Sequence, residues 1–453
     1  MHALRRGLAA AILGMAIAAS PAANAAEPAT DAPEMFIDLL IGDRAEQEAA
    51  LARIADAWHP TFTAMSLEAM YLGRGPELVS RLTRILREET GEDFGFDIQA
   101  WWEWQWNRPA EQHPHYAAFK STLYGLIDPK FAAYFDDDRT ALVRLDEVVW
   151  GGVVQDGIPP LRHPEMIAAD AADYLDDDNV IFGLAVDGDV RAYPKRILAW
   201  HEMFVDQVGG VPVAGVYCTL CGTMILYGTE VDGTNHAMGT SGFLYRSNKL
   251  MYDEATQSLW NTIWGRPVIG PLADEDIELE RMSVVTTTWG EWRRRHPDTL
   301  VLSLDTGHRR DYAEGAAYSA YFATDELMFT VPVRDTRLAN KAEVVGLVFP
   351  DAEPLAISAD YLADRPVHHD RSGAVDLVVL TDTSGANRVY AANGVRFSGY
   401  DGDTSATDTD GEIWTLSEDA LRSQDGRVLE RLPAHRAFWF GWFSAYSDTR
   451  LVM

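Results

Sequence analysis

Two cysteines, Cys218 and Cys221, are the residues whose type and spacing point most directly to chemistry. They are the only cysteines among 453 residues, and they form a Cys-x-x-Cys-Gly pattern that ends at Gly222. Apolar, β-prone residues flank the pattern and predict two strands with the cysteines in the tight turn between them. A thioredoxin-like pair needs a following helix whose N-terminus lowers the thiol pKa, and a strand is expected here instead.

A cysteine turn of this kind is typical of a metal-binding knuckle, in which backbone N–H groups point at two thiolates and glycine supplies the unusual φ. One pair leaves the metal short of ligands. We therefore expect zinc or copper at Cys218 and Cys221, with His201 and His236 completing the site and Met238 as a further candidate. Thiolates with imidazoles suit zinc, and thiolates with soft donors suit copper, above all Cu(I).

Two other interpretations of the cysteines stay open. Exported proteins oxidise their thiols, so the pair can form a redox-active, labile disulfide, and the protein would then be a thiol–disulfide redox protein. An inert disulfide is the other possibility, although closing so short a loop gains little entropy. The protein would then be a non-catalytic binding or scaffold module, and the sequence leaves open whether it is an enzyme.

Further polar residues are candidates for catalysis or substrate binding: His201, Arg246, Asp253 and His308. Arg246 and Asp253 follow the cysteine turn closely, and His308 lies where a loop could return over the same face, a place where function often resides. Turn chemistry and surface ion pairs are the alternative explanation. No nucleophile elbow, phosphate loop or dinucleotide fingerprint occurs in a convincing context.

The N-terminal residues 1–25 are typical of a secretory signal peptide. Arg5 and Arg6 precede an apolar run over residues 8–19, and small residues follow at 23–25. The run is shorter than the ~20 residues of a permanent anchor, so we expect a periplasmic or secreted protein with no membrane insertion after cleavage. A net charge of −31 disfavours nucleic acid as a partner, which leaves an unknown small molecule or protein.

The chain is expected to have an α+β fold in three parts. Residues 34–140 show apolar positions at helical spacing and resemble a HEAT-like helical module. A tryptophan cluster at positions 101–106 is expected to lie mainly in its core. Strand patterns and turn signals then predict two tandem, pseudo-symmetric β-rich repeats over residues 150–330 and 331–453, each with a tryptophan-bearing helix.

The duplication is visible when the sequence is shifted against itself. A shift of 163 places Gly183 on Gly346 and Tyr227 on Tyr390, and a shift of 150 matches the following pairs. These pairs are Trp289 with Trp439, Trp292 with Trp442, and Asp298-Thr299 with Asp448-Thr449. The candidate residues are absent from the second copy, in which Thr381, Ser384 and Asp364 stand where the first has Cys218, Cys221 and His201. The site is therefore expected in the first repeat, with the second, degenerate repeat as its structural partner.

Several motifs together resemble a known bacterial family. They lie at residues 156–159, 192–194, 200–202, 209–213, 217–222, 239–242, 250–253, 258–260 and 295–299. In this combination the chain resembles the domain-of-unknown-function family DUF3179 over roughly residues 150–453. The family often has proline after the first cysteine, where this chain has Thr219. The resemblance implies membership and carries no settled activity, and the helical module is expected to be an addition to the family domain.

Overall fold

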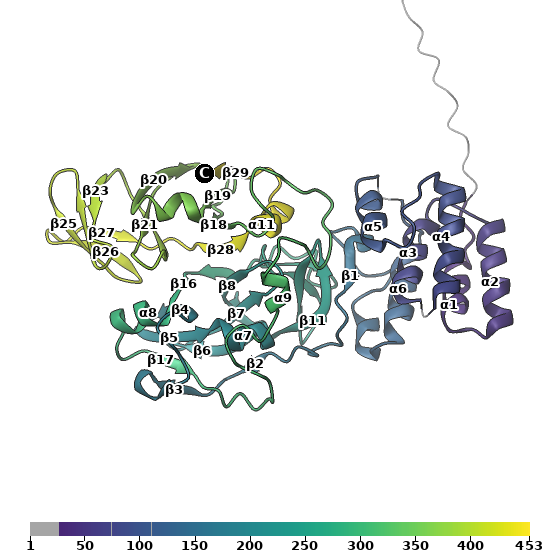
Figure 1. Ribbon diagram of the computed structural model, residues 1–453, viewed down its shortest axis with the longest axis horizontal. Helices are drawn as coiled ribbons and strands as arrows, with labels where there is room; N and C mark the ends of the chain where they lie inside the picture. The colour runs from purple at the N-terminus through teal and green to yellow at the C-terminus, as the bar shows by residue number, and fades with distance from the viewer. Residues whose placement is uncertain (1–26, 74, 110) are drawn as a thin grey trace, which may run out of the picture.

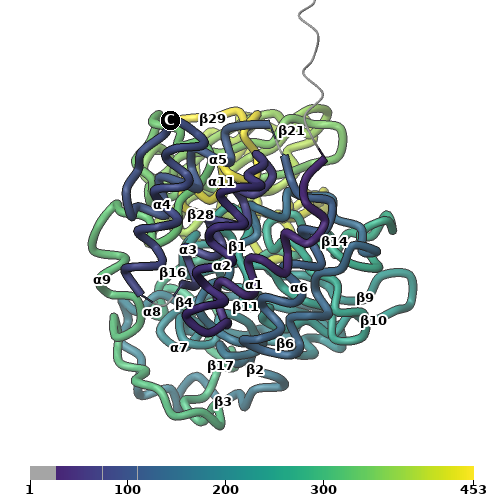
Figure 2. Tube along the Cα trace, turned by 90° about the vertical axis from the view of Figure 1, so that its right-hand side faces the viewer, coloured from purple at the N-terminus to yellow at the C-terminus, as the bar shows by residue number. Residues whose placement is uncertain are grey.

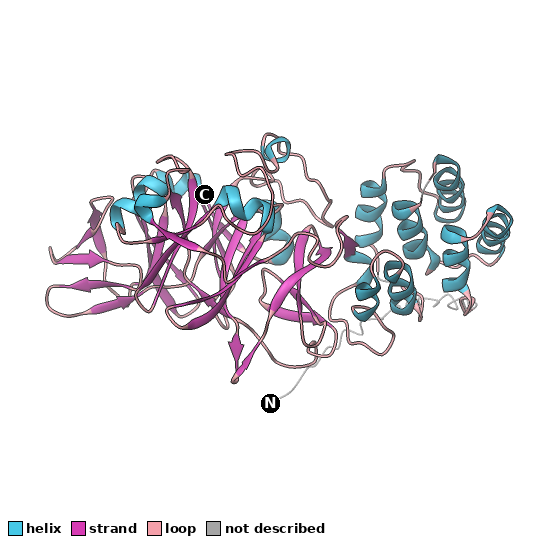
Figure 3. Ribbon diagram, turned by 90° about the horizontal axis from the view of Figure 1, so that it is seen from below, coloured by secondary structure: helices cyan, strands magenta, loops and turns pink. Residues whose placement is uncertain are grey.

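The computed structural model describes residues 27–453 except 74 and 110, so the predicted signal peptide lies outside the described residues. The α+β class is confirmed: helices gather at one end of the molecule and sheets occupy the rest (Figures 1 and 3). Within the described part of the chain, every helix is too short or too polar to cross a membrane.

The N-terminal module is a stack of helices, which lie in front of the sheets when the molecule is viewed from that end (Figure 2). They are α1 (Ala32–Ile41), α2 (Arg44–Asp56), α3 (Phe62–Leu72), α4 (Pro76–Thr90), α5 (Ile98–Trp106) and α6 (Tyr116–Gly125). Asp43 begins α2 with a reciprocal capping box to Glu46. Trp101, Trp102 and Trp106 are buried, as expected of core residues.

The module is fixed to the first repeat by a shared core. Short 3-10 helices lead out of it: η1 (Pro129–Ala133) and η2 (Leu145–Glu147). Strand β1 (Val148–Trp150) then pairs with β11 (Met238–Tyr245). The buried Lys120 ammonium donates to the Val148 carbonyl at 2.8 Å, and Phe243 of β11 belongs to the same hydrophobic cluster as the helices. The helices therefore support the sheet that carries part of the candidate site.

The first repeat is built on three principal sheets. Its remaining strands are β2 (Leu161–Arg162), β3 (Met166–Ala168), β4 (Val180–Val186), β5 (Asp189–Pro194), β6 (Met203–Val208), β7 (Val211–Cys218), β8 (Thr223–Gly228), β9 (Glu230–Val231), β10 (Thr234–Asn235), β12 (Asn248–Asp253), β13 (Leu259–Asn261), β14 (Arg266–Ile269), β15 (Glu280–Met282), β16 (Val285–Thr288) and β17 (Leu300–Leu302). Its helices are η3 (Ala169–Ala171), α7 (Lys195–His201) and α8 (Trp289–Arg295). The sheet orders are β16-β4-β5-β17-β3, β15-β8-β7-β6-β2 and β1-β11-β12-β13-β14, and β9 and β10 form a small ribbon.

The second repeat follows a linker that contains α9 (Ser319–Phe322). Its strands are β18 (Glu343–Leu347), β19 (Leu355–Ser358), β20 (Val367–Ser372), β21 (Val375–Thr381), β22 (Asn387–Ala391), β23 (Phe397–Tyr400), β24 (Ser405–Asp408), β25 (Ile413–Leu416), β26 (Ala420–Ser423), β27 (Val428–Glu430), β28 (His435–Phe438) and β29 (Arg450–Val452), and its helices are α10 (Ala359–Ala363) and α11 (Trp439–Ala445). The sheet orders are β28-β18-β19-β29, β20-β21-β22 and β23 to β27 in sequence.

The two repeats share topology and packing, which confirms the predicted pair. The order β16-β4-β5-β17 recurs as β28-β18-β19-β29, and β17 and β29 each pair in parallel with their neighbour. The Trp292 ring lies against Gly183 as the Trp442 ring lies against Gly346, where an added Cβ would come within 2.4 and 2.1 Å of the ring atoms. Each tryptophan needs a glycine opposite, which explains why these pairs appear in both copies.

The repeats pack reciprocally: β16 and α8 of the first repeat meet turn 382–385 of the second, and β28 and α11 of the second meet the cysteine turn of the first. In one direction, the Thr287 hydroxyl of β16 lies 3.1 Å from the Ser384 hydroxyl in turn 382–385 of the second repeat. In the other, the Phe438 N–H donates to the Cys221 carbonyl at 2.7 Å. Both turns therefore lie in the contact between the repeats.

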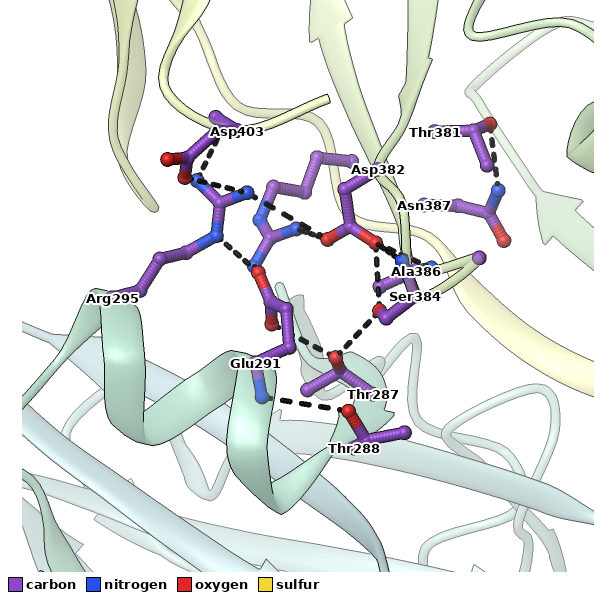
Figure 4. A network of polar contacts seen from close by, with 12 residues as sticks. Thr287, Thr288, Glu291, Arg295, Thr381, Asp382, Ser384, Ala386, Asn387 and Asp403 are labelled. Carbon is purple, nitrogen blue, oxygen red and sulfur yellow. Dashed lines mark hydrogen bonds and ion pairs between the residues drawn. The ribbon is translucent and has the colours of Figure 1, made fainter. Parts of the chain in front are cut away.

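An ion network holds the first of these contacts (Figure 4). The fully buried Arg388 bridges Asp382 at 2.6 Å, Glu418 at 2.9 Å and Glu291 of α8 at 3.5 Å. Arg295, on the same helix, pairs with Glu291 and lies 3.7 Å from Asp382. Although burial alone would raise the pKa of the Asp382 carboxyl, Arg388 and the hydrogen bonds around it hold that pKa below its usual range. The network joins helix and turn through buried charges.

We expect Arg388→Met to lower the free energy of unfolding by about 3–5 kcal/mol, because three buried carboxylates would lose the one cation that joins them. Arg422→Met is the matched control: Arg422 is exposed and pairs only with exposed Asp419, so a change within about 0.5 kcal/mol is expected. Denaturant unfolding measures both. Similar small changes in the two variants would show that the network does not hold the repeats together.

Candidate functional site

The cysteines lie in the turn between β7 and β8, as the sequence predicted. Cys218 ends β7 and pairs with Thr223 of β8, and Gly222 takes a φ of +57°. Both cysteines are free thiols, 1% and 0% exposed. A strand follows the turn, so the helix that follows the cysteines of a thioredoxin-like pair is replaced by β8 here.

Hydrogen bonds surround the two sulfurs. The Asn248 amide donates to Cys221 Sγ at 3.3 Å, and the Cys221 thiol lies 3.5 Å from the Ser247 carbonyl oxygen. Burial would raise the pKa of the Cys218 thiol, but hydrogen bonds from the Cys221 thiol and from the N–H groups of Lys249 and Cys221 hold it below its ordinary value. Burial and the adjacent Cys218 raise the pKa of Cys221. Cys218 is therefore the sulfur that ionises more readily.

A buried ion pair lies next to the turn. Lys249 Nζ donates to the Glu202 carbonyl at 2.9 Å and lies 3.4 Å from Glu202 Oε2. The Thr219 hydroxyl donates to Glu202 Oε1 at 2.7 Å. Burial lowers the pKa of Lys249, while the charges of Glu202 and Cys218 oppose that shift. A charged lysine, a carboxylate and a polarised thiol thus share one desolvated region, where electrostatic effects are strong.

A cavity of about 70 Å³ reaches this ion pair from the surface. Its walls are mostly apolar, and its polar lining consists of Glu202, Lys249, Thr240 and Tyr318. Tyr318 comes from the linker between the repeats and places its hydroxyl 3.4 Å from Glu202 Oε1. Tyr321 of the same linker donates to the Leu220 carbonyl at 2.8 Å. The linker therefore closes the cavity over the cysteine turn.

The backbone around the site is strained at several non-glycine residues. Glu202, Arg246, Ser247 and Tyr318 all have φ between +49° and +63°. Arg246 and Ser247 form the two-residue turn between β11 and β12, where asparagine and glycine are usual. Such conformations cost of order 1–3 kcal/mol each and persist where the surrounding structure fixes them, often at functional sites.

Unpartnered polar groups add to the unusual character of the site. The Tyr217 hydroxyl, the Ser247 hydroxyl and the Asn248 carbonyl oxygen are buried without a hydrogen-bond partner, and each belongs to a residue beside the cysteine turn or in contact with it. Because burying such groups is unfavourable, their concentration here favours a role for the site beyond packing.

The second repeat covers the cysteine turn from the other side. Gly441 of α11 takes the position that Glu291 has in the first repeat, and a Cβ added there would lie 3.2 Å from Cys221 Sγ. Phe438 likewise packs on Gly222. Turn 382–385 of the second repeat thus meets α8 at the charged Glu291, whereas the cysteine turn meets α11 at Gly441. The missing side chain of Gly441 leaves room for Cys221 Sγ.

His201, a predicted ligand and catalytic candidate, has both ring nitrogens occupied. Nδ1 lies 2.9 Å from the Pro159 carbonyl and therefore carries the proton, and Nε2 accepts from the Tyr312 hydroxyl at 2.6 Å. His308, which is exposed, lies beside it with the ring centroids 5.2 Å apart. The loop that carries His308 and Tyr312 therefore returns to the first repeat, where it contacts His201 at the end of α7.

The other predicted site residues lie in separate contacts. His236 Nδ1 lies 2.9 Å from Asp253 Oδ2, and both are buried. Arg246 forms an ion pair with Glu147 at the edge of the helical module. The structure thus joins His236 to Asp253 and His201 to His308, while Arg246 shares a turn with Ser247, which touches Cys221.

The structure does not bring the four predicted metal ligands together. Among the residues it describes, no three histidine, cysteine or acidic side chains are grouped as a metal site. Both nitrogens of His201 are bound by neighbours, and His236, which lies beside Asp253, belongs to no group of three such side chains among the described residues. Only the two sulfurs remain as adjacent candidate ligands.

Glu202, Lys249, Tyr318 and Asn248 are not among the site residues that the sequence predicts. Lys249 had a signal: it is a charged residue among the apolar positions of a strand, where lysine is seldom buried without a partner. Tyr318 had none, because it reaches the site from a linker more than a hundred residues further along the chain than Glu202.

Burial lowers the pKa of His201 to about 4, against about 6.5 in an unfolded chain. Between these values the unfolded chain binds a proton that the folded protein does not, so stability is complete above pH ~6.5 and falls as the pH drops towards 4. We expect a loss on the order of 2 kcal/mol over that range. In urea unfolding at several pH values, His201→Gln should show a smaller loss; parallel curves for the two proteins would contradict the assignment.

Comparison with known proteins identifies the family. A model of DUF3179, described as a protein of unknown function, matches residues 155–449, a span that contains the cysteine turn and both repeats. The helical module lies before it. Comparisons with curated proteins and with solved structures found no match. Since the match covers well over half of the chain, the protein belongs to the DUF3179 family.

Proposed function

We propose that the protein is an oxidoreductase whose redox centre is the Cys218–Cys221 dithiol. The observation that carries the proposal is that two free, buried thiols share one tight turn beside the buried Glu202–Lys249 pair, which lines a cavity. An inert staple would need neither the ion pair nor the strained, unpartnered groups around it.

The reaction balances as a thiol–disulfide exchange. The Cys218 thiolate attacks one sulfur of an oxidised partner R–S–S–R, forms a mixed disulfide and releases one R–S⁻. Cys221 then loses its proton and attacks Cys218 Sγ, which forms the intramolecular disulfide and releases the second R–S⁻. The protein loses two electrons and two protons, and the partner leaves as two thiols.

Glu202 and Lys249 are placed to handle the protons. Glu202 lines the cavity, and Lys249 interacts with both Glu202 and Cys218. The ammonium favours the Cys218 thiolate, and the carboxylate is the acceptor for the proton that leaves the dithiol. Water from the cavity can reach Glu202, so the proton has an exit.

A second candidate, a metal-binding knuckle, is favoured by one observation. Hydrogen bonding from the backbone N–H groups of Cys221 and Lys249 lowers the pKa of Cys218, as backbone N–H groups do for thiolates in knuckles. Two thiolates without imidazole suit Cu(I) better than zinc, because a soft monovalent ion accepts few soft ligands.

The dithiol proposal includes export of the protein to an oxidising compartment, which the N-terminal sequence predicts.

Redox titration of the purified protein tests the dithiol. We expect two thiols in reducing buffer and none after oxidation, with a midpoint between about −120 and −270 mV, the range of dithiol catalysts. Cys218→Ser and Cys221→Ser should each keep one thiol and form no intramolecular disulfide. Elemental analysis is carried out in parallel. If the wild-type protein holds one equivalent of copper or zinc that Cys218→Ser lacks, and if the wild-type thiols resist oxidation, the knuckle is established instead.

Glu202→Gln tests the proton acceptor. We expect it to slow oxidation of the dithiol by roughly 10- to 100-fold and to flatten the dependence of that rate on pH, because a general base is lost while the side-chain shape is kept. Glu254→Gln is the control, since Glu254 is exposed and pairs with Arg162. Stopped-flow kinetics over pH measures both, and an unchanged pH profile in Glu202→Gln would assign the proton to another group.

A further inference from the structure

We propose that the cavity in front of Glu202 and Lys249 binds the electron-exchange partner of the dithiol, and that this partner is a small, uncharged, largely apolar molecule rather than a protein. The inference rests on the proposed function and adds the chemical class of the substrate and its route to the sulfurs.

The first step is the coverage of the thiols. At 1% and 0% exposure, neither sulfur can meet a disulfide on the surface of another protein. Phe438 and Gly441 of the second repeat cover Cys221 and Gly222, and Tyr321 of the linker is bonded to Leu220. A protein partner would have to separate the two repeats, whereas a small molecule needs only an opening.

The second step is the position of the cavity. Leu220 and Leu244 line it, and both belong to the buried hydrophobic cluster that contains Cys218 and Cys221. The sulfurs and two wall residues of the cavity thus belong to one continuous hydrophobic cluster. Met328 and Val153 line the cavity nearer the surface, where Met328 is 45% exposed and Val153 is partly exposed.

The third step is the chemistry of the walls. Apart from its four polar residues, the cavity is lined by aliphatic, aromatic and glycine residues. The two charges in the lining, on Lys249 and Glu202, neutralise each other, and the hydroxyls of Thr240 and Tyr318 are bonded within the protein. Among the described residues, the lining offers no further cation to an anionic ligand, so an apolar body with at most a neutral hydrogen-bonding group fits best.

The experiment compares two low-mass disulfides on the reduced full chain: neutral dipyridyl disulfide and anionic oxidised glutathione. Each rate is divided by the rate for the same chain unfolded in guanidinium chloride, which removes the intrinsic reactivity of the reagent. We expect this ratio to be about tenfold or more larger for the neutral disulfide, because access and charge govern attack by a buried thiol.

Blocking variants locate the route. Val153→Trp with Met328→Trp fills the outer part of the cavity and should lower the ratio for dipyridyl disulfide by about tenfold or more. Val333→Trp is the matched control, because Val333 lies on the same linker, is 54% exposed and does not line the cavity. Circular dichroism and the melting temperature establish that each variant is folded before its rate is used.

The outcomes separate the inference from the proposed function. Equal ratios for the two reagents, or blocking variants that react as fast as the control, would overturn the cavity as the route. An oxidised protein partner that reacts as fast as dipyridyl disulfide would overturn the substrate class. If the blocking variants slow the reaction but mass spectrometry finds only the mixed adduct and never the Cys218–Cys221 disulfide, the cavity assignment stands and the redox function fails.

Discussion

The reciprocal packing of the two repeats is the constraint on which the rest of this structure depends. Each repeat presents a hairpin turn that it cannot bury by itself, and each supplies a strand end and helix that cover the other's turn. The same topology thereby creates two equivalent contacts. In one of them Arg388 and its carboxylates fill the space with charge, and in the other Gly441 leaves room for a sulfur. The two contacts therefore share one topology and differ in the side chains that fill them.

The cysteine turn illustrates how a buried polar site is maintained. Burying a lysine, a carboxylate and two thiols is unfavourable unless each has a partner, and here Lys249 satisfies Glu202 while Asn248 contacts Cys221. Positive φ angles at Glu202 and Ser247 are held by the sheets and by the linker. The helical module shares its hydrophobic core with the β11 sheet, so it adds buried apolar surface next to this site.

Much of the architecture could be predicted from local patterns. The paired glycines and tryptophans recur because each ring packs on a glycine, and the cysteine turn follows from two β-prone flanks around a Cys-x-x-Cys-Gly motif. The predicted ligand set could not be judged in the same way. His201 precedes Glu202 in the chain, yet α7 ends between them, and the histidine turns to Pro159 and Tyr312 while the glutamate reaches the cavity. Adjacent residues at a helix end point in different directions.

The sequence by itself therefore determined the fold class, the duplication, the family and the location of the cysteines, because these depend on periodicity, glycine requirements and short-range turn chemistry. Only the tertiary structure decided which groups surround the sulfurs. Lys249 comes from a different sheet than Cys218, Tyr318 from the linker and Gly441 from the second repeat. Their convergence follows from how sheets and repeats pack, and no spacing along the chain encodes a contact between segments so far apart.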